Sequence, residues 1–251
     1  MTKLNPIHVL LALAALAVGF SSCDDKDDVN MEAEEGQINM MFEYAVNGEA
    51  FDTSKVYQIN GTAVKFDIAN FYVGGIELVP EEGEPVAFED KYLLVTPEAG
   101  MQEAGSVGAG HYHMVRFFVG VDPATNSQSE NDFTSRSQDD PLSIQFPAMH
   151  WNWNTGYRFL RIDGKVDTDG DGQPDESLAF HLGTDPMLKN VQYMAHKDVE
   201  KGGNMLHFEF DLARLFAGID LSSDYSTHTN NNLPLAEQVR DNIPDAIQMS
   251  H

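Results

Sequence analysis

The chain has 251 residues and a formal net charge of −25, from 40 acidic residues against 15 lysines and arginines. This excess of negative charge argues against a nucleic acid partner and against electrostatic binding to anionic lipid. It is compatible with cation binding. The chain has one cysteine, so no intramolecular disulfide can form.

Residues 1–22 have the pattern of a signal peptide. Lys3 supplies the positive start, residues 7–18 form an apolar stretch, and small residues precede Cys23. The apolar stretch is shorter than the roughly 20 residues that a membrane-spanning helix needs. The small-Ser-Cys ending resembles the bacterial lipobox, so we expect Cys23 to be the lipid-bearing first residue of the mature protein. The alternative is a cysteine that merely follows an ordinary signal peptide.

Residues 23–36 contain a run of aspartates and glutamates behind the cysteine. Such a run cannot bury apolar surface, so it predicts a solvated tether. A cysteine followed at once by acidic residues also resembles the surface-export signal of Bacteroidetes lipoproteins. We therefore expect an outer-membrane lipoprotein at the cell surface, or otherwise on the periplasmic face. Residues 37–251 have a length that suits one β domain.

Short apolar or alternating segments separated by Gly, Pro and Asn fill most of this domain. In residues 111–121 the alternation places Val115, Phe117, Val119 and Val121 on one face. Asn47-Gly48 predicts a tight turn. The pattern favours an all-β fold, an antiparallel β-sandwich of immunoglobulin or jelly-roll type, with a short C-terminal helix. Strands are predicted at residues 38–44, 64–68, 71–79, 91–95, 111–121, 156–166, 177–182 and 205–212, and the helix at 234–243.

A long polar stretch, residues 120–142, interrupts the predicted strands. Loops of this length are usually functional or mobile. The equally open alternative is a plain surface loop.

An acidic loop lies between two predicted strands, with aspartates at alternate positions and Gly172 at the turn. Oxygen ligands at this spacing can surround a hard cation such as calcium. An EF-hand would place glutamate at the closing position, where this chain has Leu178, so we expect a calcium-bound hairpin instead. The alternative is an acidic turn without an ion, although close aspartates repel one another. The predicted calcium ligands are Asp167, Asp169, Asp171, the backbone carbonyl of Gln173, and Asp175.

Both tryptophans lie in one segment, residues 149–157. In a strand, Trp151 and Trp153 point to the same face. Core packing is the ordinary role of tryptophan, but His150 and two asparagines make this segment polar for a core strand.

This tryptophan segment resembles a Trp-x-Trp-Asn-x-Gly-Tyr stretch of the MbnP family of copper-associated proteins. Residues 71–79, 108–112, 117–122 and 180–183 resemble further motifs of that family and occur in the family order. The resemblance covers roughly residues 37–245. It implies a β domain of the MbnP type.

The resemblance implies an unusual chemistry. Family members are often paired with a dihaem cytochrome c peroxidase of the MauG or MbnH type, which oxidises a tryptophan to kynurenine, and kynurenine with histidines is associated with copper. On this chain the oxidised residue is Trp151 or Trp153, and His181 is the best-matched copper ligand. His181 also fits a solvated histidine on the outer face of its strand. One departure weakens the copper expectation: Glu43 lies where copper-binding members have an early-strand histidine.

His111 and His113 are two residues apart and therefore lie on one strand face, as a second candidate pair of copper ligands. We expect a lipid-anchored copper-associated binding protein, not an enzyme, because no catalytic Ser-His-Asp or Cys-His set stands out. The alternative is a surface glycan- or ligand-binding lipoprotein with structural calcium, in which Trp151, Trp153 and Tyr157, with Tyr112, form an exposed stacking platform. Hydrolysis by a carboxylate pair has no specific support.

Overall fold

A computed structural model of the chain describes residues 34–151 and 156–250. Cys23 and Trp153 therefore lie outside the described residues. Contacts group Ala33–His251 into one unit. Within the described ranges no helix is both long and apolar enough to cross a membrane.

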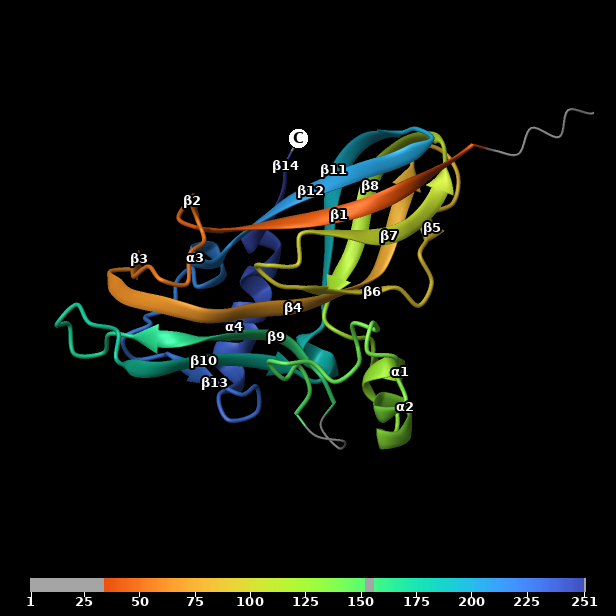
Figure 1. Ribbon diagram of the computed structural model, residues 1–251. Helices are drawn as coiled ribbons and strands as arrows, with labels where there is room; N and C mark the ends of the chain where they lie inside the picture. Colours follow the sequence, from red (N-terminus) through yellow and green to blue (C-terminus); the bar gives the residue numbers. More distant parts are fainter. Residues whose placement is uncertain (1–33, 152–155, 251) are drawn as a thin grey trace, which may run out of the picture. The chain divides into compact units, whose positions relative to one another are not determined.

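The first sheet is built around one long N-terminal strand (Figure 1). Its alternating apolar side chains, among them Ile38, Met40 and Phe42, are buried. The predicted turn at Asn47-Gly48 is confirmed, with positive φ at both residues, and it joins the first two strands as a hairpin. The strands are β1 (Glu35–Val46), β2 (Glu49–Ala50), β7 (Met101–Gly108), β12 (Gly202–Asp211) and β14 (Ile247–Ser250).

The second sheet has nine strands, and its longest strand pairs with five others. The pairing of β4 with β8 is irregular around Gly74 and Gly75. A Cβ at either position would lie within 2.5 Å of a ring atom of Tyr92 or Phe118, so glycine is required for this close approach. The strands are β3 (Tyr57–Ile59), β4 (Thr62–Pro80), β5 (Val86–Ala87), β6 (Tyr92–Val95), β8 (Gly110–Val119), β9 (Arg158–Val166), β10 (Glu176–Gly183), β11 (Lys189–Val199) and β13 (Ser226–Thr227).

The two sheets pack together through aromatic side chains. The ring of Phe42 on β1 lies 5.5 Å from Phe71 on β4 and 4.9 Å from Phe208 on β12. The ring of Phe117 on β8 lies 5.4 Å from that of Phe208. Rings from both sheets thus form one core, and the predicted β-sandwich is confirmed.

The sheets are mixed, whereas the sequence pattern predicted purely antiparallel ones. β1 pairs with β12 in parallel, and β10 pairs with β13 in parallel. Neither pair is joined by a hairpin, so no tight turn imposes an antiparallel direction. The sequence pattern also missed β7 and β11, in which few of the alternating residues are strongly apolar.

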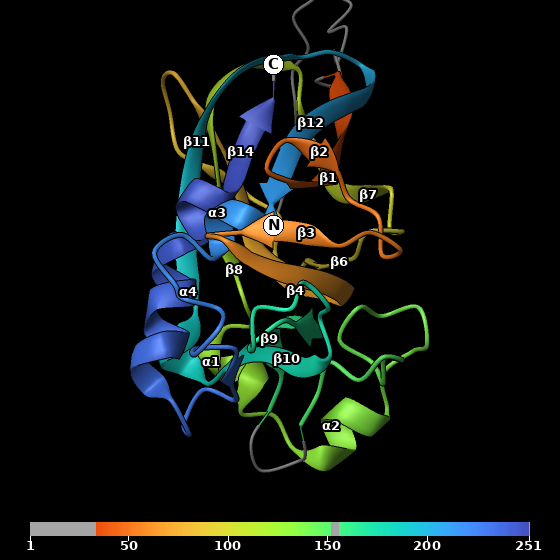
Figure 2. The same cartoon turned by 90° about the vertical axis from the view of Figure 1, so that its left-hand side faces the viewer.

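The helices are short except the last one, which lies beside the sheets (Figure 2). The predicted C-terminal helix is confirmed and begins at an Asn232 cap, with Pro234 in its first turn. Leu235, Val239 and Ile243 are buried on its inner face. The helices are α1 (Pro123–Asn126), α2 (Glu130–Thr134), the 3₁₀ turn η1 (Asp185–Met187), α3 (Leu212–Leu215) and α4 (Leu233–Ala246).

Candidate tryptophan and histidine site

Trp151 lies at the entry to β9, on a segment that folds back on itself. Its backbone N–H donates to the carbonyl of Gly156 at 3.0 Å, and His150 and Tyr157 form an antiparallel bridge. Its indole packs over Gly183 at the end of β10. A Cβ at Gly183 would lie 2.6 Å from the carbonyl oxygen of Tyr157 and 3.0 Å from the indole Nε1 of Trp151. The glycine therefore makes room for this tryptophan.

His181 is buried, although it lies on the face of β10 opposite Phe180 and Leu182. The expectation of a solvated histidine on this face was wrong, because Trp151 covers it, with the two rings 6.1 Å apart. The Nε2 atom of His181 lies 2.6 Å from a carboxylate oxygen of Asp163 on β9. Its Nδ1 atom is buried and has no hydrogen-bond partner among the described residues.

His228 completes the cluster, and no sequence motif had pointed to it. Its ring lies 4.7 Å from the ring of His181 and 6.0 Å from the indole of Trp151. Thr229 holds this loop to β10, since its hydroxyl donates to the carbonyl of His181 at 3.0 Å and accepts from the N–H of Gly183 at 3.0 Å. We call Trp151, His181, His228 and Asp163 the Trp–His cluster.

Two arginines set the charge around the Trp–His cluster. The guanidinium of Arg158 lies 5.2 Å from the ring centre of Trp151, within the range of a cation–π contact. Arg161 donates to Asp163 at 2.6 Å. Burial raises the pKa of Asp163, but hydrogen bonds from His181 and Arg161 outweigh this effect and lower it.

Burial, followed by the charges of His181 and Arg158, lowers the pKa of His228. The neutral imidazole, which is the form that binds a metal, is favoured at this position.

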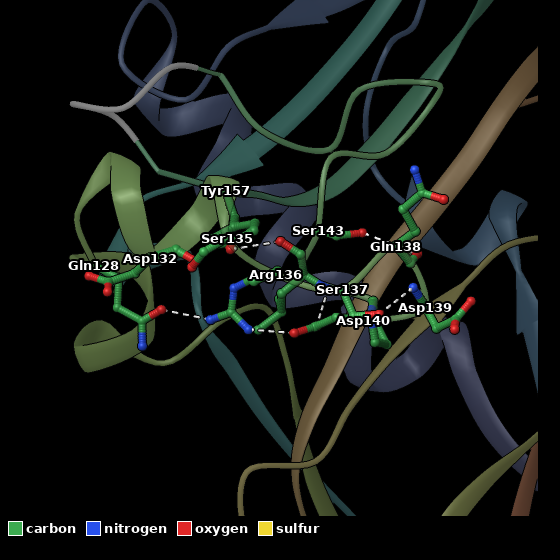
Figure 3. Close-up of polar contacts among 12 residues, drawn as sticks. Gln128, Asp132, Ser135, Arg136, Ser137, Gln138, Asp139, Asp140, Ser143 and Tyr157 are labelled. Carbon is green, nitrogen blue, oxygen red and sulfur yellow. Dashed lines mark hydrogen bonds and ion pairs between the residues drawn. The ribbon is translucent and has the colours of Figure 1, made fainter.

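Hydrogen bonds order the polar stretch 120–142 (Figure 3). Arg136 donates to Asp140 at 2.7 Å and to Gln128 at 2.6 Å. The Tyr157 hydroxyl donates to the carbonyl of Leu142 at 2.9 Å. The stretch carries α1 and α2, and Phe133 of α2 stacks on His150 at 4.1 Å. This stretch therefore forms part of the wall next to Trp151.

An apolar groove lies along this wall. Its lining includes Phe133, Met149 and Trp151, and Ile144 lies at its exposed edge. The next apolar residue, Phe146, is fully exposed. Two large apolar side chains are thus exposed in the segment that precedes Trp151.

The proposed glycan platform does not form among the described residues. Tyr157 and Tyr112 are 3% and 7% exposed, so neither ring is available for stacking on a sugar. Tyr157 is enclosed instead by Tyr72 and Phe133.

The acidic loop between β9 and β10 brings three of its predicted calcium ligands together. One carboxylate oxygen from each of Asp167, Asp169 and Asp171 lies within 4.8 Å of the others. The carboxylate oxygens of Asp167 also accept hydrogen bonds from the backbone N–H groups of Gly170 and Gly172, both at 2.8 Å. Burial raises the pKa of Asp167, but these hydrogen bonds outweigh it and lower the pKa.

The other two predicted ligands differ in their contacts. Gln173 is exposed, and its N–H donates to Asp171 at 2.7 Å. Asp175 lies outside the group of three, and its backbone carbonyl accepts from Lys165 at 2.9 Å.

His111 and His113 lie together on β8, as predicted, but they do not join the Trp–His cluster. The order of strands in the sheet places β4 and β9 between β8 and β10. Neighbouring strands are about 4.8 Å apart, so His181 is out of reach of this pair. Glu43 on β1 is exposed and belongs to the other sheet.

The fold and the Trp–His cluster define a β-sandwich protein in which one end of a mixed sheet pairs an indole with two imidazoles and a carboxylate. A family model described as MbnP matches residues 35–232, which is most of the chain. The chain belongs to the MbnP family.

The structure of MbnP from Methylosinus trichosporium is similar, with a TM-score of 0.61 and 17% sequence identity over 82% of this chain and 87% of that chain. At this identity the likeness shows the fold alone. A comparison with curated proteins finds no match.

Proposed function

We propose that this protein is a lipid-anchored, copper-associated binding protein of the cell envelope. Membership of the MbnP family points to a copper-related role. The observation that carries the proposal is the buried Nδ1 atom of His181, which has no hydrogen-bond partner among the described residues and belongs to a ring in contact with Trp151 and His228. An unpaired buried polar atom is costly, so a ligand there satisfies a need of the fold.

The residues of the Trp–His cluster fit a copper ion. Nδ1 of His181 and the imidazole of His228 would hold it, since imidazole nitrogen binds copper strongly. Asp163 would fix the ring of His181 through Nε2, as carboxylates do behind histidine ligands in many metal sites. Bound copper would supply Lewis-acid or one-electron chemistry at this position.

Trp151 is the residue that we assign to oxidation by a dihaem peroxidase partner. Its indole contacts both histidines, so a kynurenine formed there would add its donor atoms beside the imidazoles. The exposed side chains of Ile144 and Phe146, close to Trp151 in the chain, offer an apolar surface to the partner. Binding rather than catalysis is the proposed role of the chain itself.

Protein purified from its native host tests this assignment. Intact mass and peptide mass spectrometry are expected to show kynurenine within residues 149–158, and metal analysis is expected to show copper. An entirely unmodified peptide containing both tryptophans would contradict the oxidation. Intact mass also tests the lipid on Cys23, because an unmodified thiol there would exclude the anchor.

Matched variants test the roles of Trp151 and His181 separately. Trp151→Phe is expected to remove the modification, whereas His207→Asn, on β12 outside the Trp–His cluster, is expected to retain it. His181→Ala is expected to lose the copper held at this cluster. Retention of that copper in His181→Ala would contradict the copper site, whatever the state of the tryptophan.

We also propose a structural calcium ion in the acidic loop. The three convergent carboxylates of Asp167, Asp169 and Asp171 support it, because calcium takes oxygen ligands from loops of this kind. The ion would fasten the turn between β9 and β10. These two strands carry Asp163 and His181, so a firm hairpin also fixes the Trp–His cluster.

A further inference from the structure

Three histidines meet where β8 pairs with β11, two strands away from β9. His111 and His113 come from β8, and His196 comes from β11. The ring centre of His196 lies 6.0 Å from that of His111 and 5.0 Å from that of His113. His196 was not selected from the sequence, because β11 itself was not predicted.

A bulge in β11 turns His196 toward the other two rings. Met194 pairs with Met114 and Lys197 pairs with Tyr112, so β11 has one residue more than β8 over this interval. His196 has φ 41°, in the left-handed region that costs a residue other than glycine about 1–2 kcal/mol. Backbone strain of this kind persists where the surrounding structure holds it and tends to occur at ligand sites.

We propose that His111, His113 and His196 bind one late first-row transition-metal ion, Cu²⁺ or Zn²⁺, at a site separate from the Trp–His cluster. Metal–nitrogen bonds to histidine are about 2.0–2.1 Å, which places two imidazole centres around a shared tetrahedral ion about 5 Å apart. The 5.0 Å between His113 and His196 agrees with this spacing, and the 6.0 Å between His111 and His196 is about 1 Å longer. Imidazole donors suit both ions.

The proposed site requires the three rings to rotate so that one nitrogen of each faces the ion. Among the described residues only the acidic loop already brings three ligand atoms within 4.8 Å of one another. His111 and His196 are exposed and His113 is half-buried, so these side chains are free of the close packing that fixes a core residue.

Asp198 forms a hydrogen bond with one of the three proposed ligands, His111. Its carboxylate lies 2.7 Å from Nδ1 of His111, which leaves Nε2 of that ring to bind the metal. Carboxylate–histidine–metal arrangements of this type fix the tautomer of the ligand and raise its basicity. The net charge of −25 also raises the local concentration of cations around the protein.

The test is calorimetric titration of the full chain, purified in detergent and stripped of metal, with Zn²⁺ and Cu²⁺ in separate runs. Excess calcium in the buffer occupies the acidic loop. The double variant His181→Ala with His228→Ala is expected to retain one equivalent of metal, held by the three histidines. The double variant His113→Ala with His196→Asn is expected to lose that equivalent, because asparagine tolerates the left-handed backbone but supplies no imidazole.

Asp198→Asn is expected to weaken the retained equivalent about 10- to 100-fold without removing it. His207→Asn is the matched control and is expected to keep the wild-type titration. The proposal is overturned if His113→Ala with His196→Asn, folded by circular dichroism, binds the same number of ions as the wild type. It is also overturned if the double variant His181→Ala with His228→Ala binds no metal. That result would not contradict the separate proposal of a copper site at the Trp–His cluster. If His113→Ala with His196→Asn fails to fold, Cu²⁺ electron paramagnetic resonance on Asp198→Asn replaces it. A spectrum and a copper affinity equal to those of the wild type would then refute the site.

Discussion

The acidic loop and the Trp–His cluster lie near opposite ends of the hairpin formed by β9 and β10, and they satisfy their polar atoms in different ways. In the loop, Asp167 accepts two hydrogen bonds from backbone N–H groups of its own turn. In the cluster, Nδ1 of His181 and Nε1 of Trp151 are buried without hydrogen-bond partners among the described residues. The loop orients its carboxylates through its own backbone, whereas the cluster leaves Nδ1 of His181, a nitrogen that can bind a metal ion, without a partner.

This difference in hydrogen bonding predicts a different effect of a bound ion on each region. A cation at the loop would neutralise carboxylates that the backbone already orients, so its effect is on stability. A metal ion at the cluster would bind Nδ1 of His181, which the fold leaves unpaired, so its effect is on the metal content of the protein. Four measurements separate these two roles, in order of decreasing expected effect.

Calcium is expected to stabilise the wild type, because it binds the folded loop and not the unfolded chain. At a concentration 100 times the Kd the gain is about 2.7 kcal/mol. Thermal unfolding in calcium and in chelator measures it, and Asp169→Asn is expected to abolish the difference. An identical Tm in calcium and in chelator would exclude the ion and leave an acidic turn.

Asp163→Asn is expected to weaken copper binding at the Trp–His cluster about 10- to 100-fold, because the carboxylate orients His181. Competition titration against a copper chelator measures the affinity. Asp241→Asn serves as the control, since Asp241 is also ion-paired, with Lys189 and Arg240, but lies on α4. Equal affinities of Asp163→Asn and the wild type would show that the orientation of His181 does not depend on Asp163.

Gly183→Ala is expected to destabilise the protein by about 1–3 kcal/mol, the usual cost of an added methyl group without space. The Cβ would meet the Tyr157 carbonyl and the Trp151 indole. Urea unfolding measures the change. Gly203→Ala on β12 is the control, because its Cβ meets no atom closer than 3.9 Å. If the two variants are equally stable, the packing of Trp151 against β10 is looser than the structure indicates.

Acidification is expected to give the smallest effect, through His228. Burial, His181 and Arg158 lower its pKa below the ordinary value of 6.5, so the unfolded chain binds protons more readily than the folded chain. The stabilising contribution is therefore present above about pH 6.5 and is lost as the pH falls through the lowered pKa. Urea unfolding of metal-free protein between pH 8 and pH 5 measures it, and His228→Asn is expected to flatten the dependence. The same slope in both proteins would remove His228 as its cause.

Features formed by residues that are neighbours in the chain could be predicted from the sequence. The alternation in residues 111–121 gave the buried face of β8, and Val115, Phe117, Val119 and Val121 are all buried. The turn at Asn47-Gly48 and the C-terminal helix depend on neighbouring residues, so local preferences were enough. The spacing of aspartates also located the acidic loop, because these aspartates lie in one short segment.

Only the tertiary structure decided which distant residues meet. β1 and β12 are far apart in the chain, and no local signal fixes whether they pair in parallel. His228 reaches His181 because β13 adds to the edge of β10, a contact that depends on the packing of the whole sheet. His196 reaches His113 through a bulge that only strand pairing reveals. The sequence by itself determined which side chains could bind a metal, and folding determined which of them share a site, because side chains far apart in the chain become neighbours only when the strands pair.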